Sequence, residues 1–159
     1  GGSSSLQDLF RLEVVLLNAL AFDLRRPTAM HIAEQLGAEA SHDVEQDGDG
    51  ERSESQVQRE LGRYLLELAL LDGPAQRRHP PSRLAAAALL LSSELLGMRP
   101  PWPEAFDAWA GHAARALREC AEEFRALLRR AAESPFQAVQ RKFESPDRCA
   151  VARMPFPGL

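Results

Sequence analysis

The residues from His79 to Gly97, HPPSRLAAAALLLSSELLG, constrain the fold more than any other part of the sequence. Two prolines stop the preceding segment, Ser82 is suited to cap a helix by accepting a backbone N–H, and Gly97 is suited to a left-handed stop. The helix between them, Ser82–Leu96, is apolar on every side, and such a helix is either buried or spans a membrane. A bilayer crossing needs roughly 20 apolar residues, so this helix is too short to cross. We therefore predict that it is the buried central helix of an all-α domain.

Length and charge narrow the class of protein. At 159 residues the chain is long enough for one domain with a core, and 45% hydrophobic with 26% charged residues is ordinary for a globular protein. The net charge of -4 and the pI near 5.6 speak against a nucleic-acid binder, which needs a basic face. No apolar run has membrane length, and two cysteines are too few for a disulfide framework. We expect an intracellular protein that binds neither nucleic acid nor membrane.

Apolar residues recur at helical spacing along the rest of the chain, and no segment alternates as a strand does. Thr28 is suited to cap the second predicted helix and Gly37 to end it, and Gly111 to break the chain before the longest one. Residues 1–5 lack an initiating Met and have linker composition, so we expect a piece of a longer protein. Besides the central helix, the predicted helices lie at 6–24, 29–36, 56–71, 104–110, 112–132 and 136–143.

The acidic segment Ala38–Ser55 has no periodic apolar residues and is predicted to be a mobile loop. Within it, Asp43–Glu54 nearly matches a calcium-binding loop, with acids at its first, third, fifth and twelfth positions and glycine at its sixth. Its eighth position, which is apolar in such loops, is Gly50, and no second loop pairs with it. The pattern therefore favours a solvated acidic loop over a calcium site.

Nothing in the sequence indicates an enzyme or a cofactor. The four histidines have no zinc-ligand spacing and are expected at the surface or at boundaries: His31, His42, His79 and His112. Cys120 falls on the apolar face of its helix, where a buried thiol is far commoner than a nucleophile. Trp102 and Trp109 flank the short helix at 104–110 and are predicted to pin it to the core.

Five local strings follow one another along the chain: LNALAFDLRRPT at 17–28, YLLELALLD at 64–72, HPPSRLAAAALLL at 79–91, the Trp102-Pro103 connector followed by Gly111 and Cys120, and VQRKF at 139–143. Taken together and in order, they resemble the carboxy-terminal repeat of a cyclin, closest to the A and B mitotic types. Two departures stand beside the likeness: the segment Ala38–Ser55 is longer and more acidic than is usual in that family, and Phe143 stands where the family has a tyrosine.

The resemblance implies a five-helix cyclin-box domain around the central helix, with one preceding helix. Residues 6–26 would be the last helix of an otherwise absent first repeat, 27–152 the carboxy-terminal repeat, and 153–159 an irregular tail. It also implies a non-catalytic regulatory subunit, found in nucleus and cytoplasm, that binds and activates a cyclin-dependent protein kinase in cell-cycle control. No cofactor is implied.

Relatives place kinase contacts on the helix that precedes the repeat, and the matching positions here are Glu13, Leu17, Phe22 and Leu24. The first two lie one helical turn apart on one face, and the other two form an apolar pair at the end of the helix. The pattern alone leaves open a second interpretation, in which Leu17 and Leu24 simply pack against this domain.

A second class of function also remains open. The same helical fold serves as a scaffold in transcription-associated proteins and other adaptors, so the chain could be a protein-binding module without a kinase partner. An adaptor that bound DNA would need basic helix ends facing one side, and the acidic balance of the chain speaks against that.

Overall fold

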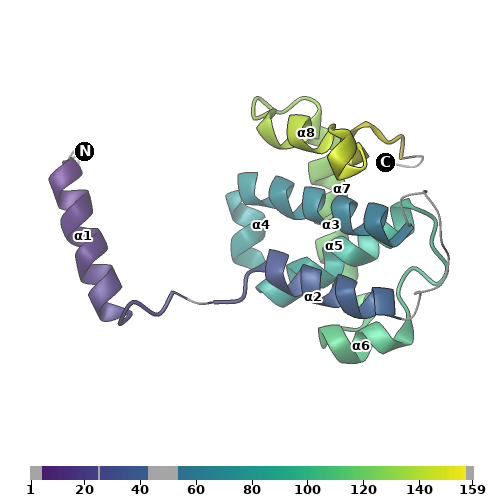
Figure 1. Cartoon of the computed structure of the whole chain (residues 1–159), viewed down its shortest axis with the longest axis horizontal. Coiled ribbons are helices and arrows are strands. Elements are labelled where there is room, and N and C mark those ends of the chain that lie inside the picture. The colour runs from purple at the N-terminus through teal and green to yellow at the C-terminus, as the bar shows by residue number, and fades with distance from the viewer. Residues whose placement is uncertain (1–4, 25, 43–53, 157–159) are drawn as a thin grey trace.

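The computed structural model describes residues 5–24, 26–42 and 54–156, and these residues form helices and connecting turns without a strand. Figure 1 shows a bundle of helices with one helix, α1, standing apart from it. The helices are α1 (Leu6–Ala19), α2 (Ala29–His42), α3 (Glu54–Leu71), α4 (Gly73–Arg78), α5 (Pro81–Leu95), α6 (Glu104–Ala110), α7 (Ala114–Ala131) and α8 (Ala138–Phe143), followed by two 3₁₀ turns at Pro146–Arg148 and Val151–Arg153.

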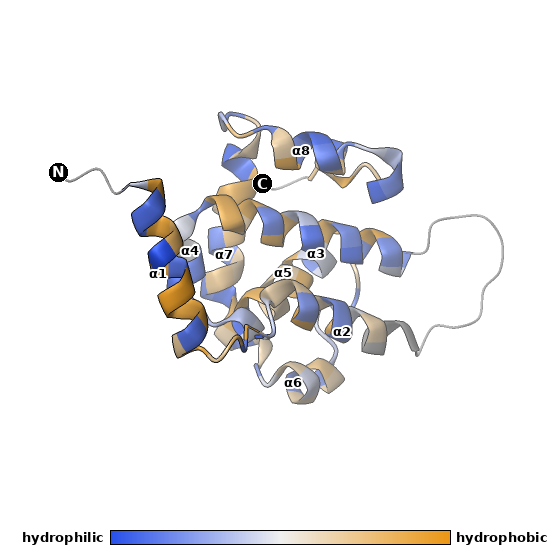
Figure 2. Ribbon diagram, turned by 60° about the vertical axis from the view of Figure 1, so that its left-hand side comes forward, coloured by the Kyte–Doolittle hydropathy of each residue, from blue (hydrophilic) through white to orange (hydrophobic). Residues whose placement is uncertain are grey.

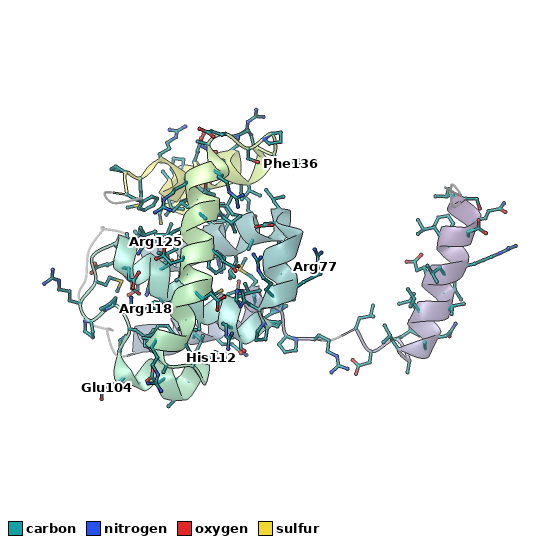
Figure 3. All side chains as sticks on the ribbon, turned by 180° about the vertical axis from the view of Figure 1, so that it is seen from behind. Arg77, Glu104, His112, Arg118, Arg125 and Phe136 are labelled. Atoms are coloured by element: carbon teal, nitrogen blue, oxygen red, sulfur yellow. The ribbon has the colours of Figure 1, made fainter. Side chains whose placement is uncertain are left out.

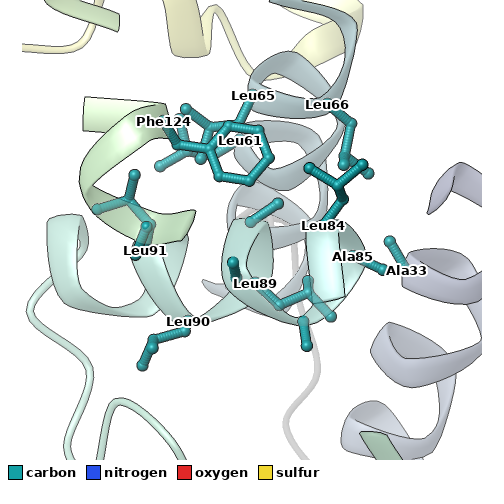
Figure 4. Close-up of a cluster of buried hydrophobic side chains, with 14 of the residues drawn as sticks. Ala33, Leu61, Leu65, Leu66, Leu84, Ala85, Leu89, Leu90, Leu91 and Phe124 are labelled. Carbon is teal, nitrogen blue, oxygen red and sulfur yellow. The ribbon is translucent and has the colours of Figure 1, made fainter. Parts of the chain in front are cut away.

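Helix α5 is the centre of the bundle, which confirms the main prediction from the sequence. It packs against α2, α3, α6 and α7, and its residues from Leu84 to Ser93 are all buried. Ala85, Ala86, Ala87 and Ala88 have no exposed surface, because neighbouring backbones approach closely over these small side chains. Figure 4 shows Phe124 of α7 next to Leu61 and the leucines of α5 nearby. The domain is therefore all-α and is built around this helix.

The start of α5 differs from the prediction. The N-cap is Pro80 and the helix begins at Pro81, since proline at the first helical position has the right φ and needs no N–H partner. Ser82 does not cap the helix: its Oγ lies 3.1 Å from Nε2 of His112, which ties α5 to the residues before α7. Gly97 does take the predicted left-handed conformation, with φ of 74°.

Three polar side chains in the core are all satisfied. Ser92 and Ser93 donate from Oγ to the carbonyl oxygens four residues earlier in α5, at 2.7 and 3.0 Å. Gln58 of α3 donates from Nε2 to Oγ of Ser93 at 2.6 Å. Because a buried polar group without a partner is costly, this pairing allows serines at the α3–α5 contact.

Two helix ends predicted from glycine and loop signals were wrong. Helix α2 continues past Gly37 to His42, because this glycine serves the packing against α3: a Cβ there would lie 3.1 Å from Cγ of Arg59. Helix α3 begins at Glu54, and the short helix α4 after it was not predicted. The remainder of the acidic segment, 43–53, lies outside the described residues, as does the main part of the calcium-like pattern.

The later helices agree with the prediction more closely. Helix α6 has the predicted bounds and ends at Gly111 with φ of 65°, while α7 and α8 are each slightly shorter than predicted. Trp102 is buried and donates from Nε1 to Oδ1 of Asp107 at 2.7 Å, so it does pin α6. Trp109 is 43% exposed, so the prediction that it also pins α6 was wrong.

His79 is buried, which corrects the expectation of surface or boundary histidines. Its Nε2 lies 3.3 Å from Oε2 of Glu123 on α7, and Nε of Arg78 lies 3.1 Å from Oε1 of the same carboxylate. The ion pair of Arg78 therefore ties the end of α4 to α7, while His79 is held next to α7 by packing and its ring nitrogens make no hydrogen bond with the described residues.

We expect Gly62→Ala to stabilise the fold by about 0.5–1 kcal/mol, because alanine is the better helix former in the middle of α3. A Cβ at this position would meet Cδ2 of Leu89 at 3.4 Å and Oγ of Ser92 at 3.6 Å, which are ordinary contacts. Urea unfolding measures the change. The control is Gly97→Ala, where no atom is near but the positive φ strains alanine, and a loss of about 1 kcal/mol is expected. A destabilised Gly62→Ala would contradict the α3–α5 packing.

Candidate functional site

Helix α1 is the part of the described chain that lacks a packing partner. It begins with a capping box: Ser5 Oγ accepts from the Asp8 backbone N–H at 3.1 Å, and the Asp8 carboxylate accepts from Ser5 N at 3.1 Å. The Ser5 hydroxyl also donates to the Asp8 carboxylate at 2.7 Å, and this bond, together with the one from Ser5 N, holds the pKa of Asp8 below its ordinary value. None of its residues is buried, and it stands away from the bundle (Figures 1 and 3). Its surface is therefore free to contact another molecule.

That surface is largely apolar, as the colouring of Figure 2 shows. Glu13 lies in the middle of it: Leu9 is one turn before Glu13, and Leu16 and Leu17 are one turn after. The Glu13 carboxylate has no ion-pair or hydrogen-bond partner among the described residues. A partner that covered this face would need to supply a cation or a hydrogen-bond donor there.

The end of α1 forms a turn that the sequence did not signal. The helix stops at Ala19 rather than continuing to Leu24, and the next residues form a Schellman motif. Phe22 N donates to Leu17 O at 2.8 Å, and Ala21 N donates to Asn18 O at 3.0 Å. Ala21 and Phe22 have φ of 50° and 56°, which a side chain with Cβ rarely adopts. The early end was missed because glycine, the usual signal, is absent.

The turn determines where the four candidate residues lie. Glu13 is exposed and Leu17 half-buried on α1, and the Schellman bond connects Leu17 directly to Phe22. Phe22 is 66% and Leu24 60% exposed. The structure thus joins Glu13, Leu17 and Phe22 in one strip and leaves Leu24 just beyond it. It does not place Leu17 or Leu24 against the domain, so the packing interpretation finds no support here.

A second apolar surface was missed by the sequence reasoning. Leu70, Leu71 and Phe136 are exposed at the ends of α3 and α7, where an open groove of about 390 Å³ lies. No signal in the sequence marks the groove, because Leu71, which lines it, falls at the same helical spacing as the buried Tyr64 and Leu68. The groove is lined by Leu68, Leu71, Asp72, Leu127, Arg130, Ala131, Glu133, Ser134 and Phe136.

No arrangement typical of catalysis is present in the described residues. Cys120 is buried, and burial together with the nearby Glu123 carboxylate raises its pKa to about 12, so it is a thiol at neutral pH rather than a nucleophile. Within 5–24, 26–42 and 54–156 no three His, Cys, Asp or Glu side chains are grouped as metal ligands. In the same residues, no helix is long and apolar enough to cross a membrane.

We expect the domain to lose stability as the pH rises from about 9 towards 12. Burial raises the pKa of Cys120 from 9.0 and that of Tyr64 from 10.0, each to about 12. The unfolded chain therefore releases these protons at lower pH than the folded chain, and the stability they contribute is complete below pH 9 and lost above it. Urea midpoints measured in steps from pH 8 to 11 test this. In Cys120→Ala the fall in the urea midpoint should begin about one pH unit higher, where Tyr64 alone contributes. A urea midpoint that stays constant with pH in the parent chain would contradict the raised pKa of these two groups.

Comparison with known proteins identifies the family. The family model for the cyclin carboxy-terminal domain matches residues 28–157. A G2/mitotic-specific cyclin-A of Hydra viridissima is 29% identical over 140 residues, which cover 88% of this chain and 31% of that protein. Cyclin-A1 of Carassius auratus is 33% identical over 147 residues, 92% of this chain and 34% of that protein. The G2/mitotic-specific cyclin cig2 of Schizosaccharomyces pombe is 31% identical over 121 residues, 76% of this chain and 26% of that protein.

These matches agree with the bundle around α5 and with the resemblance found in the five strings. The chain spans about a third of the length of the relatives it matches. The matched region of the family model includes α2 to α8 and leaves α1 before it. The chain belongs to the cyclin family, within which it matches the carboxy-terminal domain.

Proposed function

We propose that this chain is part of a cyclin-type regulatory subunit that binds and activates a cyclin-dependent protein kinase in cell-cycle control, in nucleus and cytoplasm. Residues 27–152 are the carboxy-terminal repeat, residues 6–26 are the last helix of a first repeat, and 153–159 are a tail. The subunit has no catalytic residues of its own. In this assignment Glu13, Leu17, Phe22 and Leu24 contact the kinase.

The observation that carries the proposal is the unpartnered apolar strip of α1, attached to a cyclin carboxy-terminal repeat. An exposed helix face with several large apolar side chains is typical of an interaction site rather than of a free surface. The carboxylate of Glu13 within that face supplies one polar contact, and such a contact fixes the register of a partner helix. Large apolar anchors beside one polar group are the usual composition of a binding hot spot.

The mechanism is a shift in the population of kinase conformations. A kinase is active only when the ion pair between its small-lobe helix and its catalytic lysine is formed. A subunit that contacts this helix in the active position and not in the inactive one stabilises the active conformation by the difference in binding free energy. The carboxy-terminal repeat then acts as the rigid support from which α1 extends.

The test is activation of a monomeric cyclin-dependent kinase by the natural full-length protein. We expect peptide phosphorylation to rise with added protein and to saturate at a one-to-one ratio. A kinase that stays inactive, and that does not associate with the protein in sedimentation, would contradict the proposal.

One observation favours an adaptor without a kinase as the second candidate. The groove at Leu71 and Phe136 lies on the repeat itself and is apolar enough to hold a peptide side chain. An adaptor would bind its partner there and would leave α1 free in the complex. Loss of partner binding on Phe136→Ala, without any effect on kinase activity, would favour this second function.

A further inference from the structure

The segment between Phe143 and Val151 is a surface loop fixed at both ends. Phe143 and Val151 have no exposed surface, and the Phe143 ring lies 5.2 Å from the ring of Tyr64. The residues between them are half-buried or exposed, with Pro146 and Asp147 exposed. In Figure 1 this yellow part of the chain lies beside α8 on the outside of the bundle. The loop is therefore accessible to another protein.

The loop has the sequence Ser145-Pro146-Asp147-Arg148, which combines a serine, a proline directly after it and an arginine three positions after it. Proline has no backbone N–H, so it fits an enzyme groove that offers no acceptor at that position. The guanidinium of arginine pairs with an acidic group in charge-assisted hydrogen bonds. We propose that Ser145 is phosphorylated by a proline-directed protein kinase that reads this arginine.

The reaction is a phosphoryl transfer from ATP. The Oγ of Ser145 forms a bond to the γ-phosphorus of ATP while the bond from that phosphorus to the oxygen of ADP breaks. The hydroxyl proton passes to the catalytic carboxylate of the kinase, and ADP leaves. The product carries about -1.5 to -2 charges at neutral pH.

The loop can open to fit a kinase groove without unfolding the domain. Ser145 already has an extended backbone, with φ of -65° and ψ of 141°, and Arg148 N closes the following turn by donating to Ser145 O at 3.0 Å. The next two residues, Cys149 and Ala150, have φ of 55° and 49°, a strained conformation for residues with a Cβ. Opening the turn also breaks the bonds from Ala150 N to Ser145 O and from Cys149 N to Pro146 O, each 3.0 Å, and the weak one from Asp147 N to Ser145 Oγ at 3.4 Å. The released strain offsets part of this loss.

The side chain of Arg148 is also accessible. Its ion pair with Glu60 is long, at 3.3 Å from Nη1 to Oε2, and the side chain is 35% exposed. Glu60 keeps a second partner, Arg63 at 2.9 Å, when Arg148 moves away. A kinase can therefore take the arginine without leaving the Glu60 carboxylate unpaired.

A second Ser-Pro pair in the chain serves as a comparison for Ser145. Ser134-Pro135 is the other Ser-Pro pair in the sequence, and it has the neutral Gln137 three positions after the serine. Gln137 donates from Nε2 to the carbonyl oxygens of Ala131 and Ala132, at 3.2 and 3.4 Å, and to that of Ser134. A kinase that reads only proline would modify both serines, and one that also reads a basic residue would select Ser145.

The experiment incubates the protein with ATP and a separate, activated cyclin-dependent kinase complex, followed by mass-spectrometric localisation of phosphate. Since the kinase is supplied ready-made, the result does not depend on whether this chain binds a kinase. We expect one phosphoryl group, on Ser145, absent in Ser145→Ala and unchanged in Ser134→Ala. Arg148→Gln should slow the reaction roughly tenfold, the effect of losing one charge-assisted contact.

A second variant keeps the test valid where Arg148→Gln disturbs the fold. Gln137→Arg places a basic residue three positions after Ser134 and should create a new phosphorylated site there, with Ser145 still modified. Phosphate on Ser134 and Ser145 at equal rates in the parent protein, or no phosphate on Ser145, would overturn the proposal.

Discussion

We expect kinase binding to weaken by about 100-fold or more in the double substitution Leu17→Asp with Phe22→Asp, introduced into the natural full-length protein, while the circular dichroism stays helical. The two residues are joined by the Schellman bond at the end of α1 and form the apolar half of the strip. A carboxylate at each position would lose its water without a partner when a kinase covers it. Titration calorimetry with the monomeric kinase measures the change.

The matched control is Val15→Asp on the same helix. Val15 is 63% exposed and lies on the other side of α1, beside Arg11 and Asn18. It receives one aspartate on the face of the helix opposite Glu13 and Leu17, so the helix gains a like charge outside the strip and kinase affinity should stay within about twofold. Equal losses of kinase affinity in both variants would mean that the substitutions act by unfolding α1 and not by removing contacts of the strip. Unchanged binding in the double variant would contradict the site.

The second large effect is on the core. Phe124→Ala is expected to lower the free energy of unfolding by about 3–5 kcal/mol, since the side chain is 1% exposed and fills the space between α3 and α5. Figure 4 shows its ring near Leu61 and Leu65. Truncation leaves a cavity that the alanine-rich α5 cannot fill, because its short side chains have no freedom to move into it. Urea unfolding followed by circular dichroism measures the loss.

Phe136→Ala is the control for this prediction. It removes the same atoms from a side chain that is 64% exposed at the rim of the groove, and the expected change is below about 0.5 kcal/mol. Both variants lose the same atoms, so the difference between their changes in unfolding free energy measures the effect of burial alone. Equal changes in stability would contradict the placement of Phe124 in the core.

The sequence was sufficient for the features that depend on apolar pattern. A helix that is apolar on all sides has to be central, and Cys120, which was predicted on the apolar face of its helix, is buried on α7. Gly97 and Gly111 both take the left-handed conformation that their positions suggested. These features follow from burial and from single residues with a strong preference, so they do not need knowledge of neighbours in space.

The features that depend on such neighbours could not be predicted. Gly37 looked like a helix end, but it allows α2 to approach Arg59 of α3. Ser82 looked like a cap, but it pairs with His112 from a distant part of the chain. The end of α1 was missed because Ala21 takes a conformation that its residue type disfavours.

For the candidate site, the sequence and the family likeness supplied the four residues, and the structure supplied their geometry. Glu13 and Leu17 could be placed on one helix face from their spacing alone. The connection from Leu17 to Phe22 could not, since it exists only in the turn that replaces the predicted last turn of the helix. The exposed state of Phe22 and Leu24 also required the structure.

The most direct test of the account is amide hydrogen exchange of the natural full-length protein with and without a monomeric cyclin-dependent kinase. The account predicts slower exchange at residues 13–24 in the complex, while α5 exchanges slowly and equally in both states. Formation of a complex in which residues 13–24 exchange as fast as in the free protein would contradict it.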